Sequence, residues 1–166
     1  MATIAAALGF VCGCSDDDDS TGPATQEMTA ILLAHSDCGG YDTGGEIVDA
    51  ITSSQSAIIW DWDGQGTLYL HHINAAFNCC PNISCEFVFE ENTITVVEIE
   101  EGDCNCLCLF DVDFKITGLS PGLYTFRFEE LYLEEGDPEL ELSMSLTTTV
   151  ASDVVVVNRD HYPWGT

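Results

Sequence analysis

The sequence predicts an all-β fold, an antiparallel β-sandwich of about seven or eight strands. Apolar and polar residues alternate over short segments, as in strands that bury one face. Residues that favour turns separate these segments at short intervals. The hydrophobic share is 46% and the aromatic share 10% of 166 residues, which suffices for the core of one domain.

The strand signals begin near Ala57 and continue to Val157. Asp63-Gly64-Gln65-Gly66 and Glu90-Glu91-Asn92 are expected to form hairpin turns. Two earlier segments are ambiguous, because 28–34 fits a helix or a strand and 46–53 has a helical period. The expected strands are 57–62, 67–77, 85–89, 93–100, 110–117, 123–133, 140–146 and 154–157.

Two of these segments show the alternation most clearly. Each has an apolar residue at every second position, so one face is expected to be buried and the other to contact water. These residues are Phe110, Val112, Phe114 and Ile116 in the first segment, and Leu140, Leu142, Met144 and Leu146 in the second.

The segment 116–126, ITGLSPGLYTF, connects two expected strands. It resembles the strand-turn-strand corner of immunoglobulin-like and prealbumin-like sandwiches. That resemblance implies an architecture and no activity, because many unrelated functions share the corner.

The first 13 residues, MATIAAALGFVCG, form an apolar run. The run is too short to span a bilayer, which takes about 20 residues, and is typical of a cleaved signal peptide. Val11-Cys12-Gly13-Cys14 resembles the bacterial lipobox. The resemblance implies cleavage before Cys14 by signal peptidase II and acylation of Cys14 with palmitate-type chains. Cys12 does not fit, because the bulky Val11 directly precedes it.

One feature departs from the lipoprotein pattern: no Lys or Arg precedes the apolar run. Either translation starts upstream, or the segment is a short buried strand. Ser15 and the four aspartates that follow it resemble the acidic signals that bring some lipoproteins of Bacteroidetes-type bacteria to the cell surface. They also fit a plain solvated tether. We expect a signal peptide at 1–13, a lipidated cysteine and acidic tether at 14–27, and one sandwich domain at 28–166, anchored to the outer membrane.

The chain is strongly acidic, with 29 Asp and Glu residues against three Lys and Arg and a net charge of -26. Nucleic acids and anionic lipid surfaces are bound through Lys and Arg, so both are disfavoured as partners. Three roles remain for the acidic surface: it binds a cationic partner, it binds a metal cation, or it only keeps the protein soluble.

Nine cysteines in a chain of this size indicate disulfides in an oxidising compartment. Removal of Cys12 and lipidation of Cys14 would leave seven. Cys104, Cys106 and Cys108 alternate in register with the core residues of the following strand, so we expect them on its buried face, too parallel to pair with each other. The most economical scheme joins Cys79, Cys80 and Cys85 to Cys104, Cys106 and Cys108 in some order and leaves Cys38 odd.

Two alternatives to disulfides stay open: reduced buried thiols and a soft-metal site. Thiolates and imidazoles suit Zn²⁺ or Cu⁺. Against a metal, the spacing lacks the CxxC pairs of structural zinc sites, and histidines in strands more often pack in the core. The candidate ligands are Cys104, Cys106, Cys108, His71 and His72.

Asp61, Asp63 and two glycines form DxDGxG, which resembles part of a calcium loop without its last acidic ligand. Asp-Gly between strands also favours a hairpin turn, so a turn and a Ca²⁺ site remain alternatives. His35-Ser36-Asp37 are consecutive and cannot converge as a triad on their own. Tyr162-Pro163-Trp164 is expected to pack back on the domain.

A wider resemblance extends over residues 68–126. This region resembles a cysteine-rich domain of surface lipoproteins of Bacteroidetes-type bacteria that has no established activity. The resemblance implies origin and architecture and adds no mechanism. It rests on His72-Ile73-Asn74, Phe77-Asn78-Cys79-Cys80, Asn92-Thr93-Ile94, Cys104-Asn105-Cys106-Leu107-Cys108 and Phe110-Asp111-Val112.

Together these features predict a non-catalytic, lipid-anchored module of the cell envelope with a binding or structural role. Its partner would be a protein or a glycan that the sequence does not identify. The first alternative is an envelope protein that binds Zn²⁺ or Cu⁺ through the CxCxC region, and a small secreted hydrolase is a remote one.

Overall fold

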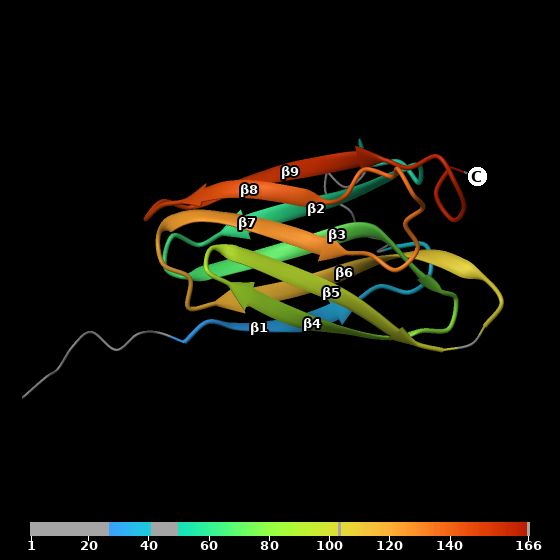
Figure 1. Ribbon diagram of the computed structural model, residues 1–166, viewed down its shortest axis with the longest axis horizontal. Helices are drawn as coiled ribbons and strands as arrows, with labels where there is room; N and C mark the ends of the chain where they lie inside the picture. Colours follow the sequence, from blue (N-terminus) through green and yellow to red (C-terminus); the bar gives the residue numbers. More distant parts are fainter. Residues whose placement is uncertain (1–26, 41–49, 103, 166) are drawn as a thin grey trace, which may run out of the picture.

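The computed structural model describes residues 27–40, 50–102 and 104–165. Within these ranges the chain forms nine strands in two sheets that pack face to face (Figure 1). The predicted all-β sandwich is confirmed. The strands are β1 (Thr29–His35), β2 (Gln55–Trp62), β3 (Thr67–Asn78), β4 (Asn82–Glu90), β5 (Thr93–Glu101), β6 (Leu107–Thr117), β7 (Gly122–Glu129), β8 (Glu141–Leu146) and β9 (Ala151–Asn158).

The larger sheet has the order β1-β6-β3-β2-β9 and the smaller one β4-β5-β7-β8. All neighbouring strands are antiparallel except β5 and β7, which are parallel. This parallel pair is the exception to the predicted antiparallel pairing. Between β5 and β7 the chain crosses to the other sheet, runs back along β6 and returns, so β7 has the same direction as β5.

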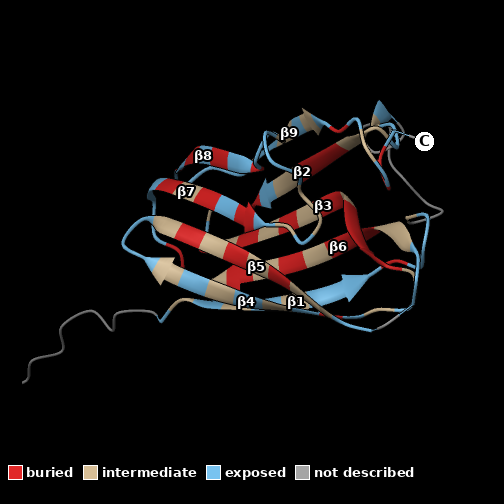
Figure 2. Cartoon of the chain, turned by 45° about the vertical axis from the view of Figure 1, so that its right-hand side comes forward, coloured by how far each residue is buried: buried red, intermediate tan, exposed pale blue. Residues whose placement is uncertain are grey.

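The core lies between the two sheets and follows the predicted alternation. In β6 the side chains of Phe110, Val112, Phe114 and Ile116 are buried, and β8 alternates in the same way. Asp111, which was expected on the face of β6 that contacts water, is buried as well. Figure 2 shows buried positions recurring along β5, β6 and β7. Burial of each large apolar side chain contributes about 1.5 to 3 kcal/mol, so this layer supplies most of the driving force for folding.

Three segments differ most from the expectation. The ambiguous segment 28–34 is mostly strand, because β1 pairs with β6 at the edge of the larger sheet. Of the segment with a helical period, 46–49 lie outside the described residues and 50–53 contain no α-helix. β7 ends at Glu129, and residues 130–140 form a loop where the sequence predicted strand to Leu133.

The sandwich has two different ends. The turns 63–66, 91–92, 118–121 and 147–150 lie at one end, which we call the turn pole. The segments 36–40, 50–54, 79–81, 104–106, 130–140 and 159–165 lie at the other end, the loop pole, together with the C-terminus (Figure 1).

The chain enters the described domain at the turn pole. Gly118, with φ 82°, lies so close to Glu27 that a Cβ atom at this glycine would be 2.5 Å from the Glu27 carbonyl oxygen. The predicted signal peptide, Cys14 and nearly all of the tether lie outside the described residues. In the part of the chain that the structure describes, no helix has the length and apolarity that a membrane span requires.

Candidate functional site

Polar side chains replace apolar ones in the core as four strands approach the loop pole. The inward positions of β5 are Ile94, Val96 and then Glu98, and β3 passes in the same way from leucines to His72. In the same way, Ser56 lies at the loop-pole end of β2, and Glu130 directly follows the last residue of β7. The residues thus brought together, with one from the segment after β9, form what we call the buried polar cluster: Ser56, His72, Glu98, Glu130 and Arg159.

The imidazole of His72 is the centre of this cluster. Its Nε2 lies 2.8 Å from Ser56 Oγ, and its Nδ1 lies 2.5 Å from Glu98 Oε1. The ring packs edge-on against Phe128 at 5.5 Å between centroids. Since Ser56 and His72 belong to one sheet and Glu98 to the other, these contacts tie the two sheets together.

An ion pair extends the cluster towards the loops. Glu130 Oε2 accepts a hydrogen bond from Arg159 Nη2 at 2.6 Å, and Nη1 of the same arginine donates to the Pro138 carbonyl oxygen. Glu130 Oε1 lies 3.7 Å from His72 Nε2. The side chains of Arg159 and Glu130 are 0% and 2% exposed. The loop 130–140 and the C-terminal segment are therefore both fixed to the core.

The buried charges set the ionisation of this cluster. Burial by itself would lower the pKa of His72, but the charge of Glu98, its hydrogen bond and Glu130 together raise that pKa above the usual value. Burial raises the pKa of Glu130, while His72 and Arg159 oppose the rise. When all four ionisable groups of the cluster are charged, the two positive charges of His72 and Arg159 balance the two negative charges of Glu98 and Glu130.

Ser56, His72 and Glu98 have the order of a nucleophile, a base and an acid in a hydrolase relay. The relay is enclosed, however, because Ser56 and His72 are 0% exposed and Glu98 is 2% exposed. A substrate carbonyl cannot reach an Oγ atom in this position, so in this conformation the cluster holds the sheets together. The expectation that a histidine in this strand packs in the core is confirmed for His72.

Sequence reasoning missed most of this cluster, although a signal was present. Polar residues stand at inward positions of otherwise apolar alternating strands, as Glu98 does after Ile94 and Val96. A buried acid requires a partner, and the partner here comes from the other sheet.

Three disulfide bonds lie at the loop pole: Cys38–Cys108, Cys79–Cys106 and Cys80–Cys104, with Cα atoms 5.6, 5.6 and 6.0 Å apart. The expectation that Cys38 is odd was wrong. Because β1 pairs with β6, the segment after β1 lies beside the start of β6, as the hydrogen bond from Gly39 N to Leu109 O shows.

Cys85 is the free cysteine among the described residues, so its expected bridge was wrong as well. It lies within β4 opposite Glu98 of β5, and not in the segments that contain the three bridges. Burial raises the pKa of its thiol to about 11, and the charge of Glu98 adds to this effect. Cys104 and Cys106 were expected in a core strand but precede β6 and are exposed.

The soft-metal alternative at Cys104, Cys106, Cys108, His71 and His72 is not supported by the structure. All three sulfurs form disulfides, so none is a free thiolate. The two histidines are neighbours in β3 and point to opposite faces of the sheet. His72 lies in the core, whereas His71 lies on the outer face, with its Nδ1 2.7 Å from Asp113 Oδ1.

Asp61 and Asp63 do not form a calcium site in this structure. Asp63 Oδ1 accepts hydrogen bonds from the backbone N–H groups of Gln65 and Thr67, and these bonds lower the pKa of Asp63. This is the geometry of the hairpin turn between β2 and β3. Asp61 lies instead 3.8 Å from His71, and among the described residues no third ligand joins the two aspartates.

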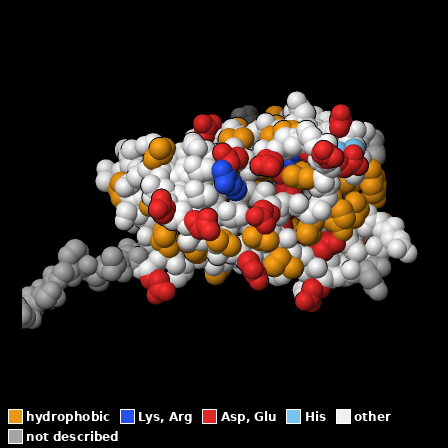
Figure 3. Space-filling model, in the orientation of Figure 1, with side chains coloured by type: hydrophobic (Ala, Val, Ile, Leu, Met, Phe, Trp, Pro, Cys, Tyr) orange, Lys and Arg blue, Asp and Glu red, His pale blue; other side chains and the backbone are white. Residues whose placement is uncertain are grey.

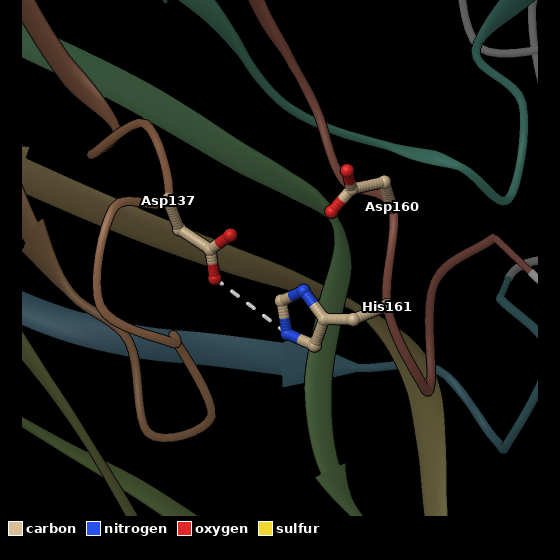
Figure 4. A group of neighbouring side chains, drawn as sticks. All are labelled: Asp137, Asp160 and His161. Carbon is tan, nitrogen blue, oxygen red and sulfur yellow. Dashed lines mark ion pairs between the residues drawn. The ribbon is translucent and has the colours of Figure 1, made fainter.

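A second group of titratable side chains lies where the loop 130–140 meets the C-terminal segment. It consists of Asp137, Asp160 and His161, each of which offers one possible ligand atom within 4.8 Å of the others. Figure 4 shows the His161 ring below the gap between the two carboxylates. Sequence reasoning missed this group because its members lie in two loops that show no periodicity.

The local fold positions two of these side chains firmly. Asp137 Oδ2 accepts the Glu134 N–H at 2.6 Å in a tight turn. The His161 ring packs edge-on against Trp164 at 5.2 Å, and Trp164 Nε1 donates to the Asn74 carbonyl oxygen. Trp164 is 0% exposed. The expectation that the C-terminal aromatic segment packs back on the domain is confirmed for Pro163 and Trp164, while Tyr162 is exposed.

Comparison of the chain with protein-family models, curated proteins and solved structures found no match.

Proposed function

We propose that this chain is an exported, lipid-anchored module of the cell envelope that acts through binding or structural contacts and not through catalysis. The observation that carries the proposal is the set of three disulfides at the loop pole. Such bonds persist in oxidising compartments and are rare in the reducing cytosol. Export also agrees with the apolar N-terminal run and with the lipobox-like residues before Cys14.

The arrangement of the two poles suits a protein that presents its loop pole away from the membrane. The chain enters the domain at the turn pole, beside Gly118, and the disulfide-linked loops lie at the opposite end. An anchor at Cys14 would therefore hold the turn pole towards the membrane and present the loop pole outwards. Disulfides would keep these loops rigid, which lowers the entropy lost when a partner binds.

The surface charge limits the classes of partner that the protein can bind. Acidic side chains are spread over the face in Figure 3, where basic ones are few. All three basic side chains of the protein have intramolecular contacts: Lys115 lies over the Tyr69 ring, Arg127 pairs with Glu141, and Arg159 pairs with Glu130. A partner would accordingly present cationic groups, and nucleic acid would be repelled.

The non-catalytic part of the proposal rests on the enclosure of the buried polar cluster. Ser56 Oγ has the partner that would activate it, yet the residue is 0% exposed. Its hydrogen bond to His72 stabilises the core instead.

The lipid anchor is tested by labelling the full chain with a palmitate analogue in a bacterial host that processes lipoproteins. Cys14→Ser should abolish incorporation of the label. Cys12→Ser is the matched control and should leave it unchanged, because Val11 excludes this cysteine as the acylation site. Label retained in the Cys14→Ser variant would overturn the anchor.

Export is tested separately by counting thiols in protein taken directly from cells under acid quench. The described domain should release one thiol on unfolding without reductant, that of Cys85, and seven after reduction. Seven thiols before reduction would show a reducing compartment and contradict export.

A further inference from the structure

We infer that Asp137, Asp160 and His161 bind one divalent transition-metal ion of the Zn²⁺ class. This site is independent of the lipid anchor and differs from the cysteine-based site that the sequence suggested. It lies at the loop pole, between the loop 130–140 and the segment after β9.

The donor atoms suit this class of ion. Imidazole nitrogen favours Zn²⁺ and its neighbours in the first transition row, and carboxylate oxygen binds them as well. In a tetrahedral zinc site the donor atoms lie roughly 3.4 Å apart. One atom from each residue already lies within 4.8 Å of the others. Asp160 is exposed, and no hydrogen bond or ion pair to a described residue holds its carboxylate, so rotation of this side chain can bring it towards the other two ligands.

The two nitrogens of His161 have different surroundings, and this is the second observation behind the site. Nε2 lies 3.3 Å from the Tyr132 carbonyl oxygen and 3.6 Å from Asp137 Oδ2. A carbonyl oxygen only accepts, so Nε2 carries the proton of that bond. In the neutral ring Nδ1 then carries a lone pair. This atom is buried and has no hydrogen-bond partner among the described residues.

Nδ1 of His161 points into the gap between the carboxylates of Asp137 and Asp160 (Figure 4). A lone pair that faces two negative groups is unfavourable, and either a proton on this nitrogen or a metal cation between the three groups relieves the repulsion. Histidine ligands of metals commonly have this arrangement, in which the second ring nitrogen donates to a carbonyl or carboxylate and fixes the tautomer.

The surrounding charge favours a cation. The loop 130–140 also contains Glu134, Glu135 and Glu139, all exposed. The nearest base in sequence, Arg159, is turned into the core towards Glu130 and does not neutralise the group. Hard cations such as Ca²⁺ prefer oxygen donors in larger number, which leaves the imidazole without a role for them.

The test is equilibrium dialysis of the purified, oxidised full chain against Zn²⁺, with the intrinsic tryptophan fluorescence as a second readout because Trp164 packs on His161. We expect one Zn²⁺ per chain at this site. Asp160→Asn should weaken binding by about tenfold or more without loss of folding, since this side chain is exposed. His161→Gln and Asp137→Asn should weaken it as well.

Two control variants match these changes. Glu135→Gln removes one exposed charge from the same loop, and His71→Gln removes an imidazole that also lies near two carboxylates, those of Asp61 and Asp113. Both should leave the affinity within about twofold of the parent. The absence of Zn²⁺ binding would overturn the site. The site would also be overturned if Glu135→Gln weakened Zn²⁺ binding as much as Asp160→Asn, or if His71→Gln abolished Zn²⁺ binding. Binding of Ca²⁺ that is unchanged in His161→Gln would overturn it as well.

Discussion

Removal of the Cys38–Cys108 bond should destabilise the protein about twice as much as removal of either of the other two bonds. This bridge closes a loop with a sequence separation of 70. Closure of such a loop removes conformational entropy from the unfolded chain, and for about 70 residues the chain-entropy relation gives about 4.4 kcal/mol at 25 °C. Hydrogen bonds beside the bridge, such as Gly39 N to Leu109 O, persist without it.

The other two bonds are nested, since Cys80–Cys104 lies inside Cys79–Cys106. When one of them is removed, the other still closes nearly the same loop. What is lost is a small ring of about five residues, for which the same relation gives about 2 kcal/mol.

The measurement is urea unfolding of oxidised protein, followed by tryptophan fluorescence, for the paired serine variants of each bridge. Cys85→Ser serves as the control because it changes a cysteine without opening a loop. Equal losses for the long and the nested bridges would refute the entropic reasoning. A larger loss for Cys80→Ser with Cys104→Ser would do the same.

Three further predictions concern the buried polar cluster. Arg159→Met should destabilise the fold by about 3 kcal/mol in urea unfolding, because it removes the hydrogen-bonded charge partner of the buried Glu130. The double variant with Glu130→Gln should regain part of this loss, and no recovery would contradict the pairing. Since the pKa of His72 is raised above its usual 6.5, the stability it contributes is fully present below pH 6.5 and is lost as the pH rises through the higher folded pKa. Urea midpoints should therefore fall between about pH 6 and about pH 9 in the parent, and much less in His72→Gln. His71→Gln should remove a smaller part of this fall, because the His71 side chain is 35% exposed. Ser56→Ala should cost about 1 to 3 kcal/mol by leaving His72 Nε2 without its partner, and the folded parent should not react with a fluorophosphonate; a covalent adduct on Ser56 would show that the relay opens to solvent.

The sandwich could be predicted because its core obeys a simple period. Apolar and polar residues alternate in the sequence from Phe110 to Ile116 and from Leu140 to Leu146, and turn residues mark where the strands end. The parallel pairing of β5 with β7 could not be predicted in this way. It depends on which sheet β6 joins, and periodicity contains no information about that choice.

The candidate sites were harder to predict for a related reason. Periodicity shows that Glu98 faces inwards, but not that His72 of the other sheet lies opposite it. The pairing of Cys38 with Cys108 required the position of β1 beside β6, and the sequence left β1 ambiguous. Asp137 and His161 meet only because two irregular loops share one end of the sandwich.

Cys85, the free thiol among the described residues, has a consequence for the permanence of the disulfide pattern. Exchange requires a thiolate, and with a pKa of about 11 only about one Cys85 side chain in 10,000 would be ionised at pH 7. Before β4 pairs with β5, the same thiol would ionise more readily and could attack wrongly formed bridges. The cysteine that takes no part in the final pattern would thus help the chain to correct errors during oxidative folding. Once the strand has docked, the raised pKa of the Cys85 thiol would slow its attack on the three bridges.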